Sequence, residues 1–249
     1  MKTTFKKAKK TFADYIDSTL FTAGIGALFF NPFYFARKGL IKGIGEFSGK
    51  LKGEMLDVGC GNKPYKKMFS CEKYVGLEIN TQRQQENKNV DFFYDGKTFP
   101  FNSKKFDSVF CSEVLEHVFE PFNFIDEINR VLKIDGKLLL TVPFVWNEHE
   151  QPYDYGRYSS FGISHLLEKH GFKIIGNQKT GRGITTIIQL TTEYIRKATL
   201  TKSYSINLLL IGLISAPINI IGSILALILP KGQDLFIDNV ILAQKISDI

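Results

Sequence analysis

The chain of 249 residues is 44% hydrophobic and 23% charged, which excludes an intrinsically disordered protein and is enough for one large domain. The formal net charge of +7 lies at one end, because residues 1–53 hold ten Lys or Arg against three acidic residues and residues 54–249 hold 22 of each. An electroneutral body argues against a nucleic-acid groove in the fold, and the basic N-terminal arm predicts contact with an anionic surface.

The N-terminus and the cysteines indicate a cytoplasmic protein. The chain begins with several lysines before an uncharged stretch, but two acidic residues precede that stretch and Asn31-Pro32 interrupts it, so we expect no secretory signal. The three cysteines have neither the even number of a disulfide framework nor the spacing of a metal site. We therefore expect reduced thiols and no bound metal.

From residue 53 onward, short apolar runs alternate with segments of helical periodicity. The sequence predicts strands at 54–58, 74–79, 90–94, 106–111, 137–142 and 172–176, and helices at 62–70, 114–132 and 160–170. This alternation is typical of βαβ units in a parallel sheet, which binds ligands beyond the carboxyl ends of its strands. We divide the chain into an N-terminal basic and apolar helical arm (1–52), an α/β core (53–180), an apolar helical insertion (181–233) and a final strand (234–249).

The insertion contains an uncharged stretch from Ile206 to Leu229. A straight helix of that length would measure about 36 Å and could cross a hydrocarbon core of about 30 Å. Because the chain must return to the sheet for its final strand, and Pro217 lies in the middle, we predict two short helices in a shallow hairpin on the cytoplasmic face of an anionic membrane. A membrane span, a buried helix pair and a dimer contact stay open as alternatives.

The segment LDVGCG reads as a buried strand followed by a glycine turn. Gly59 and Gly61 would let the backbone approach a ligand closely, and Glu78 ends the next predicted strand, where a carboxylate can accept hydrogen bonds from a pair of ribose hydroxyls. A dinucleotide-binding fingerprint would need a small residue where Pro64 stands, whereas Asp57 can pair with a ligand ammonium. The pattern favours S-adenosylmethionine over NAD.

Four motifs in order, LDVGCG, YVGLEI, DFFYDGKTFPF and KFDSVFCSEVLEHV, resemble the class I S-adenosylmethionine-dependent methyltransferases. The following EINRVLKIDGKLLLTVPF resembles the helix and fifth strand of that family. The resemblance covers residues 53–180, and it implies a Rossmann-like sheet that is mostly parallel with an antiparallel last strand. The stretch over 149–175 is similar to a narrower bacterial group associated with surface-polysaccharide and lipopolysaccharide biosynthesis.

The resemblance also implies a cofactor site, made by Asp57, Gly59, Cys60, Gly61, Glu78, Asp95, Gly96, Ser112 and Glu113. In this family pattern Glu78 binds the ribose hydroxyls, Asp95 faces the adenine amino group, and Asp57 supports the amino end of the methionine. Asn62-Lys63-Pro64 departs from the pattern, since many members have glycine or small residues there. The role of Asn62 therefore stays open.

Two histidines are the candidates for a general base, because the unperturbed pKa of histidine lies near neutral pH. His117 follows the fourth predicted strand of the sheet and His149 follows the fifth. His149 belongs to a polar and aromatic loop that offers an acceptor site with Asp154, Arg157 and Tyr158. Structural roles are the alternatives for both histidines, and Arg157 either binds an anionic group of the acceptor or pairs with Asp154.

These observations predict an S-adenosylmethionine-dependent methyltransferase that O-methylates a glycan or lipid-linked acceptor at the cytoplasmic membrane surface. The alternatives are a catalytically inactive binding module of a membrane complex and a methyltransferase acting on a quinone-like or other small molecule. We do not expect a nucleic-acid partner, since the sequence has neither an Asn-Pro-Pro-Tyr stretch nor a target-reading domain. NAD-linked oxidoreduction is a further reading that the glycine turn disfavours.

Overall fold

The computed structural model describes residues 21–249, so the basic residues between Lys2 and Lys10 lie outside the described part. The chain divides into two compact units. A helical unit contains residues 21–41 together with Gly181–Ile237, and a sheet unit contains Lys42–Thr180 and Asp238–Ile249.

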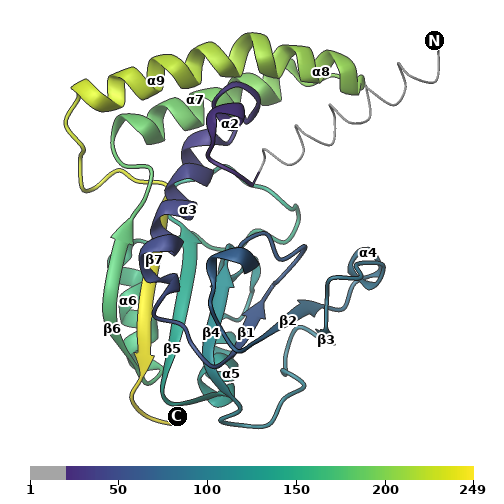
Figure 1. Ribbon diagram of the computed structural model, residues 1–249, viewed down its shortest axis with the longest axis vertical. Helices are drawn as coiled ribbons and strands as arrows, with labels where there is room; N and C mark the ends of the chain where they lie inside the picture. Colours follow the sequence, from purple (N-terminus) through teal and green to yellow (C-terminus); the bar gives the residue numbers. More distant parts are fainter. Residues whose placement is uncertain (1–20) are drawn as a thin grey trace. The chain divides into compact units, whose positions relative to one another are not determined.

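The sheet unit is built on a seven-stranded sheet with the order β3-β2-β1-β4-β5-β7-β6 (Figure 1). Its strands are β1 (Glu54–Val58), β2 (Lys73–Ile79), β3 (Phe92–Tyr94), β4 (Phe106–Ser112), β5 (Leu132–Pro143), β6 (Phe172–Lys179) and β7 (Asp238–Lys245). The first five strands pair in parallel, and β7 lies antiparallel between β5 and β6. This sheet confirms the predicted fold class.

The central strands form because apolar residues fill both of their faces. Leu56 of β1 lies opposite Val109 of β4, and both side chains are fully buried. Such continuous apolar runs are typical of parallel strands that helices cover on both sides. Between the strands lie η1 (Lys66–Met68), α4 (Gln82–Gln85), η2 (Leu115–His117), α5 (Pro121–Val131) and α6 (Ser160–Lys169).

Two predicted helices of the sheet unit differ from the structure. Residues 62–70 form only the short 3₁₀ turn η1, because Lys63 has a left-handed φ of 54°, which excludes it from a right-handed α-helix. The helix predicted over 114–132 is divided into η2 and α5, since Pro121 begins a new helix at its first position.

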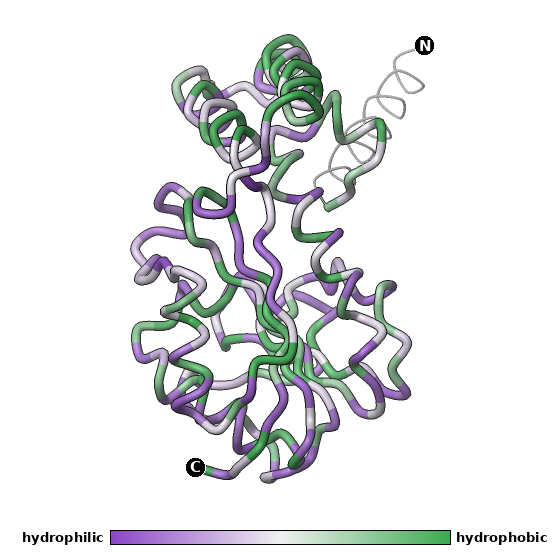
Figure 2. Tube along the Cα trace, turned by 90° about the vertical axis from the view of Figure 1, so that its left-hand side faces the viewer, coloured by the Kyte–Doolittle hydropathy of each residue, from purple (hydrophilic) through white to green (hydrophobic). Residues whose placement is uncertain are grey.

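The helical unit consists of α2 (Ile25–Phe30), the first part of α3 (Tyr34–Ser48), α7 (Ile184–Thr199), α8 (Tyr204–Leu210), the π-helical turn η3 (Ile211–Ser215) and α9 (Ala216–Ile228). The last three elements are continuous and form one helix from Tyr204 to Ile228, which we call the long helix. Figure 2 shows hydrophobic residues along much of this segment. By length and composition it is long and apolar enough to cross a membrane.

The prediction of two short helices around Pro217 is wrong. The π-helical turn η3 ends directly before Ala216. Such a turn changes the hydrogen-bonding pattern locally, so the helix can continue past Pro217, which has no backbone N–H to donate. A hairpin does exist, but α7 and the long helix form it (Figure 1). A Cβ added at Gly222 would lie 2.6 Å from Ile188 Cγ2, which shows how closely these helices approach.

Buried polar side chains form hydrogen bonds with the backbone where α2 ends and α3 begins. Asn219 of the long helix donates from Nδ2 to the carbonyls of Leu28 and Asn31, at 3.1 and 3.0 Å. Gln189 of α7 donates to the carbonyl of Pro32 at 2.7 Å. These bonds satisfy main-chain groups between α2 and α3 that would otherwise be buried without partners.

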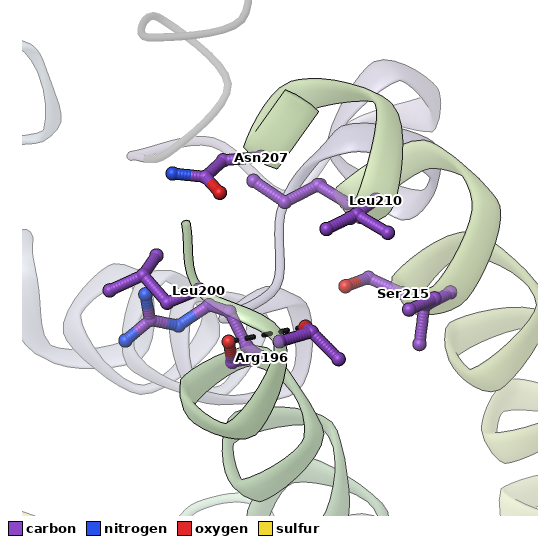
Figure 3. Close-up of a pocket in the computed structure, with 8 residues that line it drawn as sticks. Arg196, Leu200, Asn207, Leu210 and Ser215 are labelled. Atoms are coloured by element: carbon purple, nitrogen blue, oxygen red, sulfur yellow. Dashed lines mark hydrogen bonds between the residues drawn. The ribbon is translucent and has the colours of Figure 1, made fainter. Parts of the chain in front are cut away.

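A small cavity lies between α7 and the start of the long helix (Figure 3). Its volume is about 30 Å³, and its lining includes Arg196, Leu200, Asn207 and Ser215. A cavity of this volume has room for one or two water molecules and not for a methyl acceptor.

The chain leaves and re-enters the sheet unit at neighbouring positions. Thr180 donates from its amide to the carbonyl of Asp238 at 2.9 Å, and from its hydroxyl to Asp238 Oδ2 at 3.1 Å. The segment from Gly181 to Ile237 therefore begins and ends beside the junction of β6 and β7.

Candidate functional site

The candidate cofactor residues gather at the carboxyl ends of four neighbouring parallel strands. In the order β3-β2-β1-β4 the chain turns back between β1 and β4, which makes this edge the topological switch point of the sheet. Open α/β sheets bind their ligands at such a point. The order of the strands thus brings together motifs that are far apart in the sequence.

The glycine turn after β1 has left-handed backbone conformations, with φ of 70° at Gly59 and 45° at Gly61. A Cβ at Gly59 would lie 2.2 Å from Val114 Cγ2, whereas a Cβ at Gly61 would meet nothing within 4 Å. Gly59 is therefore required for packing, and Gly61 leaves open space in front of its backbone. Open space beside the backbone of a glycine turn lets a ligand approach the main chain closely.

Glu78 is buried near the end of β2 and its carboxylate points to the glycine turn. Oε2 accepts a hydrogen bond from the amide of Gly61 at 2.9 Å, and Oε1 accepts from the amide of Ile79 at 3.0 Å. A carboxylate oxygen has a second acceptor site, so each oxygen keeps capacity for one more donor. This arrangement fits a pair of ribose hydroxyls.

Asp57 lies at the carboxyl end of β1 and is 3% exposed. Burial raises the pKa of its carboxyl group to about 7, and the hydrogen bond from Tyr74 opposes part of that rise. The Tyr74 hydroxyl lies 2.5 Å from Asp57 Oδ2. Tyr74 was not predicted as a site residue, because its position at the start of β2 gives no sign of a contact across the two strands.

Asp95 follows β3 and is exposed. Its Oδ1 accepts hydrogen bonds from the amides of Lys97 and Thr98, at 2.9 and 3.0 Å, and the Thr98 and Lys97 amides lower the pKa of the carboxyl group. The second carboxylate oxygen makes neither of these bonds. Asp95 thus shapes the turn that contains Gly96, at the edge where the predicted cofactor site lies.

Ser112 ends β4, Glu113 follows it, and one residue of β5, Thr141, contacts both. The hydroxyls of Ser112 and Thr141 lie 2.8 Å apart, and the Thr141 hydroxyl lies 2.8 Å from Glu113 Oε1. Cys60, which was also predicted here, is buried beside the glycine turn. The structure therefore places the predicted cofactor residues along one edge of the sheet.

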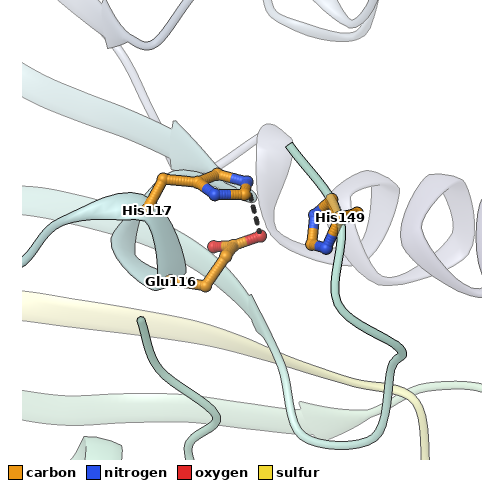
Figure 4. Close-up of side chains that lie close together, drawn as sticks. All are labelled: Glu116, His117 and His149. Atoms are coloured by element: carbon orange, nitrogen blue, oxygen red, sulfur yellow. Dashed lines mark ion pairs between the residues drawn. The ribbon is translucent and has the colours of Figure 1, made fainter. Parts of the chain in front are cut away.

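The two candidate histidines face one another (Figure 4). The ring centres of His117 and His149 are 4.7 Å apart at an interplanar angle of 72°. His117 Nδ1 lies 2.7 Å from the carbonyl oxygen of Tyr153, which only accepts, so Nδ1 carries the proton of this hydrogen bond. Burial, and next the neighbouring His117, lower the pKa of His149.

Glu116 lies beside both histidines and was missed in the sequence. Its side chain is fully buried, and Oε1 is 3.8 Å from His117 Nε2. Burial, with a further contribution from Glu113, raises the pKa of this carboxyl group well above its usual value. The sequence offered one signal for Glu116, an acidic residue directly before a histidine at the end of a predicted strand. Because both residues were assigned to a helix predicted over 114–132, this signal was not used.

The remaining predicted acceptor residues hold the loop after β5. Arg157 pairs bidentately with Asp154, with both N–O distances at 2.6 Å, and it also donates to the carbonyls of Asn147 and Gly156. Although burial of Asp154 acts in the opposite direction, the hydrogen bond from Arg157 lowers its pKa to about 2. Tyr158 packs against the hydrophobic core. In this structure Arg157 is thus occupied by its own loop.

The sheet and the motifs at its edge are those of a methyltransferase domain that uses S-adenosylmethionine. Residues 56–140 match the family model described as a methyltransferase domain. The match spans the glycine turn, Glu78, Asp95 and the first histidine, so the predicted cofactor and enzyme class are confirmed.

Known proteins are similar to this chain at low sequence identity. An uncharacterized protein of Methanocaldococcus jannaschii is 25% identical over 141 residues, which are 52% of this chain and 69% of the relative. The Haemonchus contortus phosphoethanolamine N-methyltransferase 2 structure is 18% identical with a TM-score of 0.54, over 92% of this chain and 56% of the other. The [4+2]-cyclase SpnF is 19% identical with a TM-score of 0.53, over 83% and 80%.

Proposed function

We propose that this methyltransferase methylates a hydroxyl of a glycan or lipid-linked acceptor on the cytoplasmic surface of an anionic membrane. The observation that carries the membrane association is the exposed apolar face of the long helix. The choice of acceptor is supported by the resemblance of residues 149–175 to bacterial enzymes of surface-polysaccharide and lipopolysaccharide biosynthesis.

The residues at the sheet edge fit the cofactor. Gly61 leaves space in front of its backbone, and Glu78 keeps acceptor capacity for two hydroxyls. When bound, S-adenosylmethionine supplies a methyl group that its sulfonium activates for transfer. We assign to Glu78 the binding of the ribose and to Asp57 the support of the amino end, as the family resemblance implies.

The acceptor hydroxyl must lose a proton, and we assign this step to the two histidines. The lowered pKa of His149 keeps its imidazole neutral at pH 7, so the ring can accept a proton. A positioned base contributes about 10²–10⁴-fold to such a reaction. We propose that His149 and His117 mark the acceptor side of the site, and that the Asp154–Arg157 pair keeps their loop in place.

The long helix exposes a stripe of large apolar side chains. Leu209, Leu213 and Leu227 are 61%, 64% and 87% exposed, and only 22% of the most apolar 18-residue window is buried. The stripe continues over Ile206, Ile221, Ile224 and Ile228. An exposed apolar surface of this extent marks an interaction site rather than ordinary protein surface.

The partner helix of this hairpin supports an orientation in the plane of the membrane. Buried Glu193 of α7 pairs with Arg196 at 2.6 Å, and exposed Lys197 follows. If the long helix crossed the bilayer, α7 would have to enter the hydrocarbon with these charges, which is costly. An apolar face lying in the interface while α7 stays outside avoids that cost.

Sedimentation with vesicles tests the membrane proposal. We expect the protein to pellet with phosphatidylglycerol vesicles, and a Leu213→Glu, Leu227→Glu double variant to stay in the supernatant. Phe161→Glu is a matched control, because Phe161 of α6 is 84% exposed but belongs to the sheet unit. Wild-type protein that stays in the supernatant, or a double variant that pellets equally, would contradict the proposal.

The acceptor is tested by incubating the enzyme and radiolabelled cofactor separately with membranes and cytosol of the producing cells. Label in a lipid-linked or polymeric glycan of the membrane fraction supports the proposal. Label in a quinone-like lipid, or only in soluble small molecules, would replace the proposed acceptor class.

A catalytically inactive binding module is the second candidate. The fold alone leaves this candidate open, because the [4+2]-cyclase SpnF has a similar fold and a fold does not fix a reaction. Calorimetric titration with S-adenosylmethionine separates the two candidates, because a protein without cofactor binding has no methyl donor.

A further inference from the structure

Glu116, His117 and His149 form a cluster whose potential ligand atoms all lie within 4.8 Å of one another. The first two residues belong to η2 at the carboxyl end of β4, and His149 comes from the loop after β5. Figure 4 shows the Glu116 carboxylate directed between the two imidazole rings. Residues from two separate segments thus point at one small volume.

Glu116 is the unusual member of the cluster, because both of its carboxylate oxygens are buried without a hydrogen-bond partner among residues 21–249. Other buried acids have one: Asp57 accepts from Tyr74, and Glu193 pairs with Arg196. A buried carboxylate without a donor is strongly unfavourable, and buried charges are normally paired or bind a metal. A cation bound beside Glu116 would give both carboxylate oxygens a partner.

Each histidine ring has an oxygen acceptor near its Nδ1 atom. His117 donates from Nδ1 to the carbonyl of Tyr153, which leaves the lone pair of Nε2 directed toward the Glu116 side, 3.8 Å from Oε1. Histidines that bind metals almost always donate their other ring N–H to a carbonyl or a carboxylate. For His149, Nδ1 lies 3.2 Å from Asp154 Oδ2 but makes no hydrogen bond among the described residues, so a carboxylate stands beside the ring without accepting from it.

The loop that carries His149 is tied to η2. The amides of Tyr155 and Gly156 donate to the carbonyl of Glu116 at 2.7 and 3.2 Å. The amide of His149 donates to Asp154 Oδ2 at 3.0 Å, and Asp154 is held by Arg157. The cluster is thus positioned by main-chain contacts before any ion binds, as a functional site requires.

We propose that Glu116, His117 and His149 bind one divalent transition-metal ion, for which Zn²⁺ is the best match. Two imidazoles and one carboxylate suit Zn²⁺, and three protein ligands leave its fourth position open to water or a substrate oxygen. Around a tetrahedral ion with bonds of about 2.0–2.1 Å, ligand atoms lie about 3.4 Å apart, so small side-chain rotations would close the cluster.

Such an ion would act on the acceptor. It would lower the pKa of a bound water to about 7, and an acceptor hydroxyl in the same position would likewise release its proton to solvent more readily. This catalytic use rests on the proposed function, whereas metal binding itself does not. In the metal-bound enzyme His149 is a ligand, and the metal replaces it as the means of removing the proton.

Titration of tag-free protein with Co²⁺, followed by visible absorption, and with Zn²⁺, followed by calorimetry, tests the site. We expect one equivalent to bind to the wild type, with Glu116→Gln and His149→Ala weakening binding by more than about 100-fold, the upper end of the loss for an outer-shell partner. His165→Ala, at an exposed position of α6, is the matched control and should bind as the wild type does.

A wild type without binding, or variants that bind equally well, would overturn the proposal. If Glu116→Gln does not fold, the half-buried loop position of His149 keeps the test available. A second readout is the melting temperature, which Zn²⁺ should raise in the wild type and in His165→Ala but not in Glu116→Gln.

Calorimetry with S-adenosylmethionine on the same preparations separates this inference from the proposed function. Protein that binds S-adenosylmethionine but no metal would refute the metal site and leave the methyltransferase proposal intact. Protein that binds the metal but no cofactor would support the metal site and refute the proposed reaction.

Discussion

Replacing the buried carboxylate of Asp57 by the isosteric amide, Asp57→Asn, should change how the stability of the cofactor-free protein depends on pH. The pKa of Asp57 is raised to about 7 by burial, so the folded state favours the protonated form. A raised carboxyl pKa means that stability is greatest below the unfolded pKa and is lost as the pH rises toward the folded pKa. Asparagine has no such titration, and its carbonyl can still accept the Tyr74 hydrogen bond.

The magnitude follows from the interval between the two pKa values. With 3.8 in the unfolded state and about 7 in the folded state, the wild type loses about 4 kcal/mol relative to the amide when Asp57 is fully ionised. About 1.5 kcal/mol of this is lost by pH 5, since titration of the unfolded chain begins near pH 4. The free energy of unfolding of Asp57→Asn, minus that of the wild type, should therefore rise by about 2.5 kcal/mol between pH 5 and pH 8.

Urea denaturation followed by circular dichroism at pH 5, 6, 7 and 8 measures this difference. Asp95→Asn is the matched control, because the exposed Asp95 has a lowered pKa and stays ionised over this range. A difference between Asp57→Asn and the wild type that is constant from pH 5 to pH 8 would show that Asp57 is not desolvated as described.

Three further predictions concern binding and stability. Glu78→Gln should weaken S-adenosylmethionine binding by about 10- to 150-fold in calorimetry, since a hydrogen bond to a charged group contributes about 1.5–3 kcal/mol; equal affinity would refute its assignment to the ribose. Gly59→Ala should destabilise the fold by about 2 kcal/mol or more in urea denaturation, because φ is 70° and its Cβ would lie 2.2 Å from Val114 Cγ2. Lys245→Met should lower the free energy of unfolding by about 2–5 kcal/mol in the same measurement, because the fully buried ammonium group donates to the carbonyls of Asn129 and Leu132 at 2.7 and 3.0 Å. An unchanged denaturation midpoint would contradict the role of these bonds.

The strands and the cofactor edge could be predicted because their signals are local. The runs around Leu56 and Val109 are continuous and apolar, as strands buried on both faces require. The glycine turn after β1 and Glu78 at the end of β2 follow such runs directly, and parallel pairing then brings their carboxyl ends together. The local sequence pattern and the topology of a parallel sheet were therefore sufficient to predict the strands and the residues at their carboxyl ends.

The parts that were missed depend on contacts between distant segments or on backbone details. The position of Glu116 beside His149 results from the loop after β5 folding back on η2, which no spacing in the sequence encodes. The shortened helix after Gly61 depends on the backbone conformation of Lys63. The continuous long helix depends on a π-helical turn before Pro217, a local adjustment that propensities do not predict.

The junction between Thr180 and Asp238 has a consequence for how such an enzyme can diversify. Because these two residues are already hydrogen-bonded neighbours, everything from Gly181 to Ile237 can be exchanged, lengthened or shortened while β6 and β7 keep their register. The entropic cost of closing a loop rises only slowly with its length, so inserted segments of different length would change the stability of the sheet little. A change in the segment inserted at this junction would therefore leave the glycine turn after β1 and Glu78 of β2 unaltered, since both lie on other strands of the sheet.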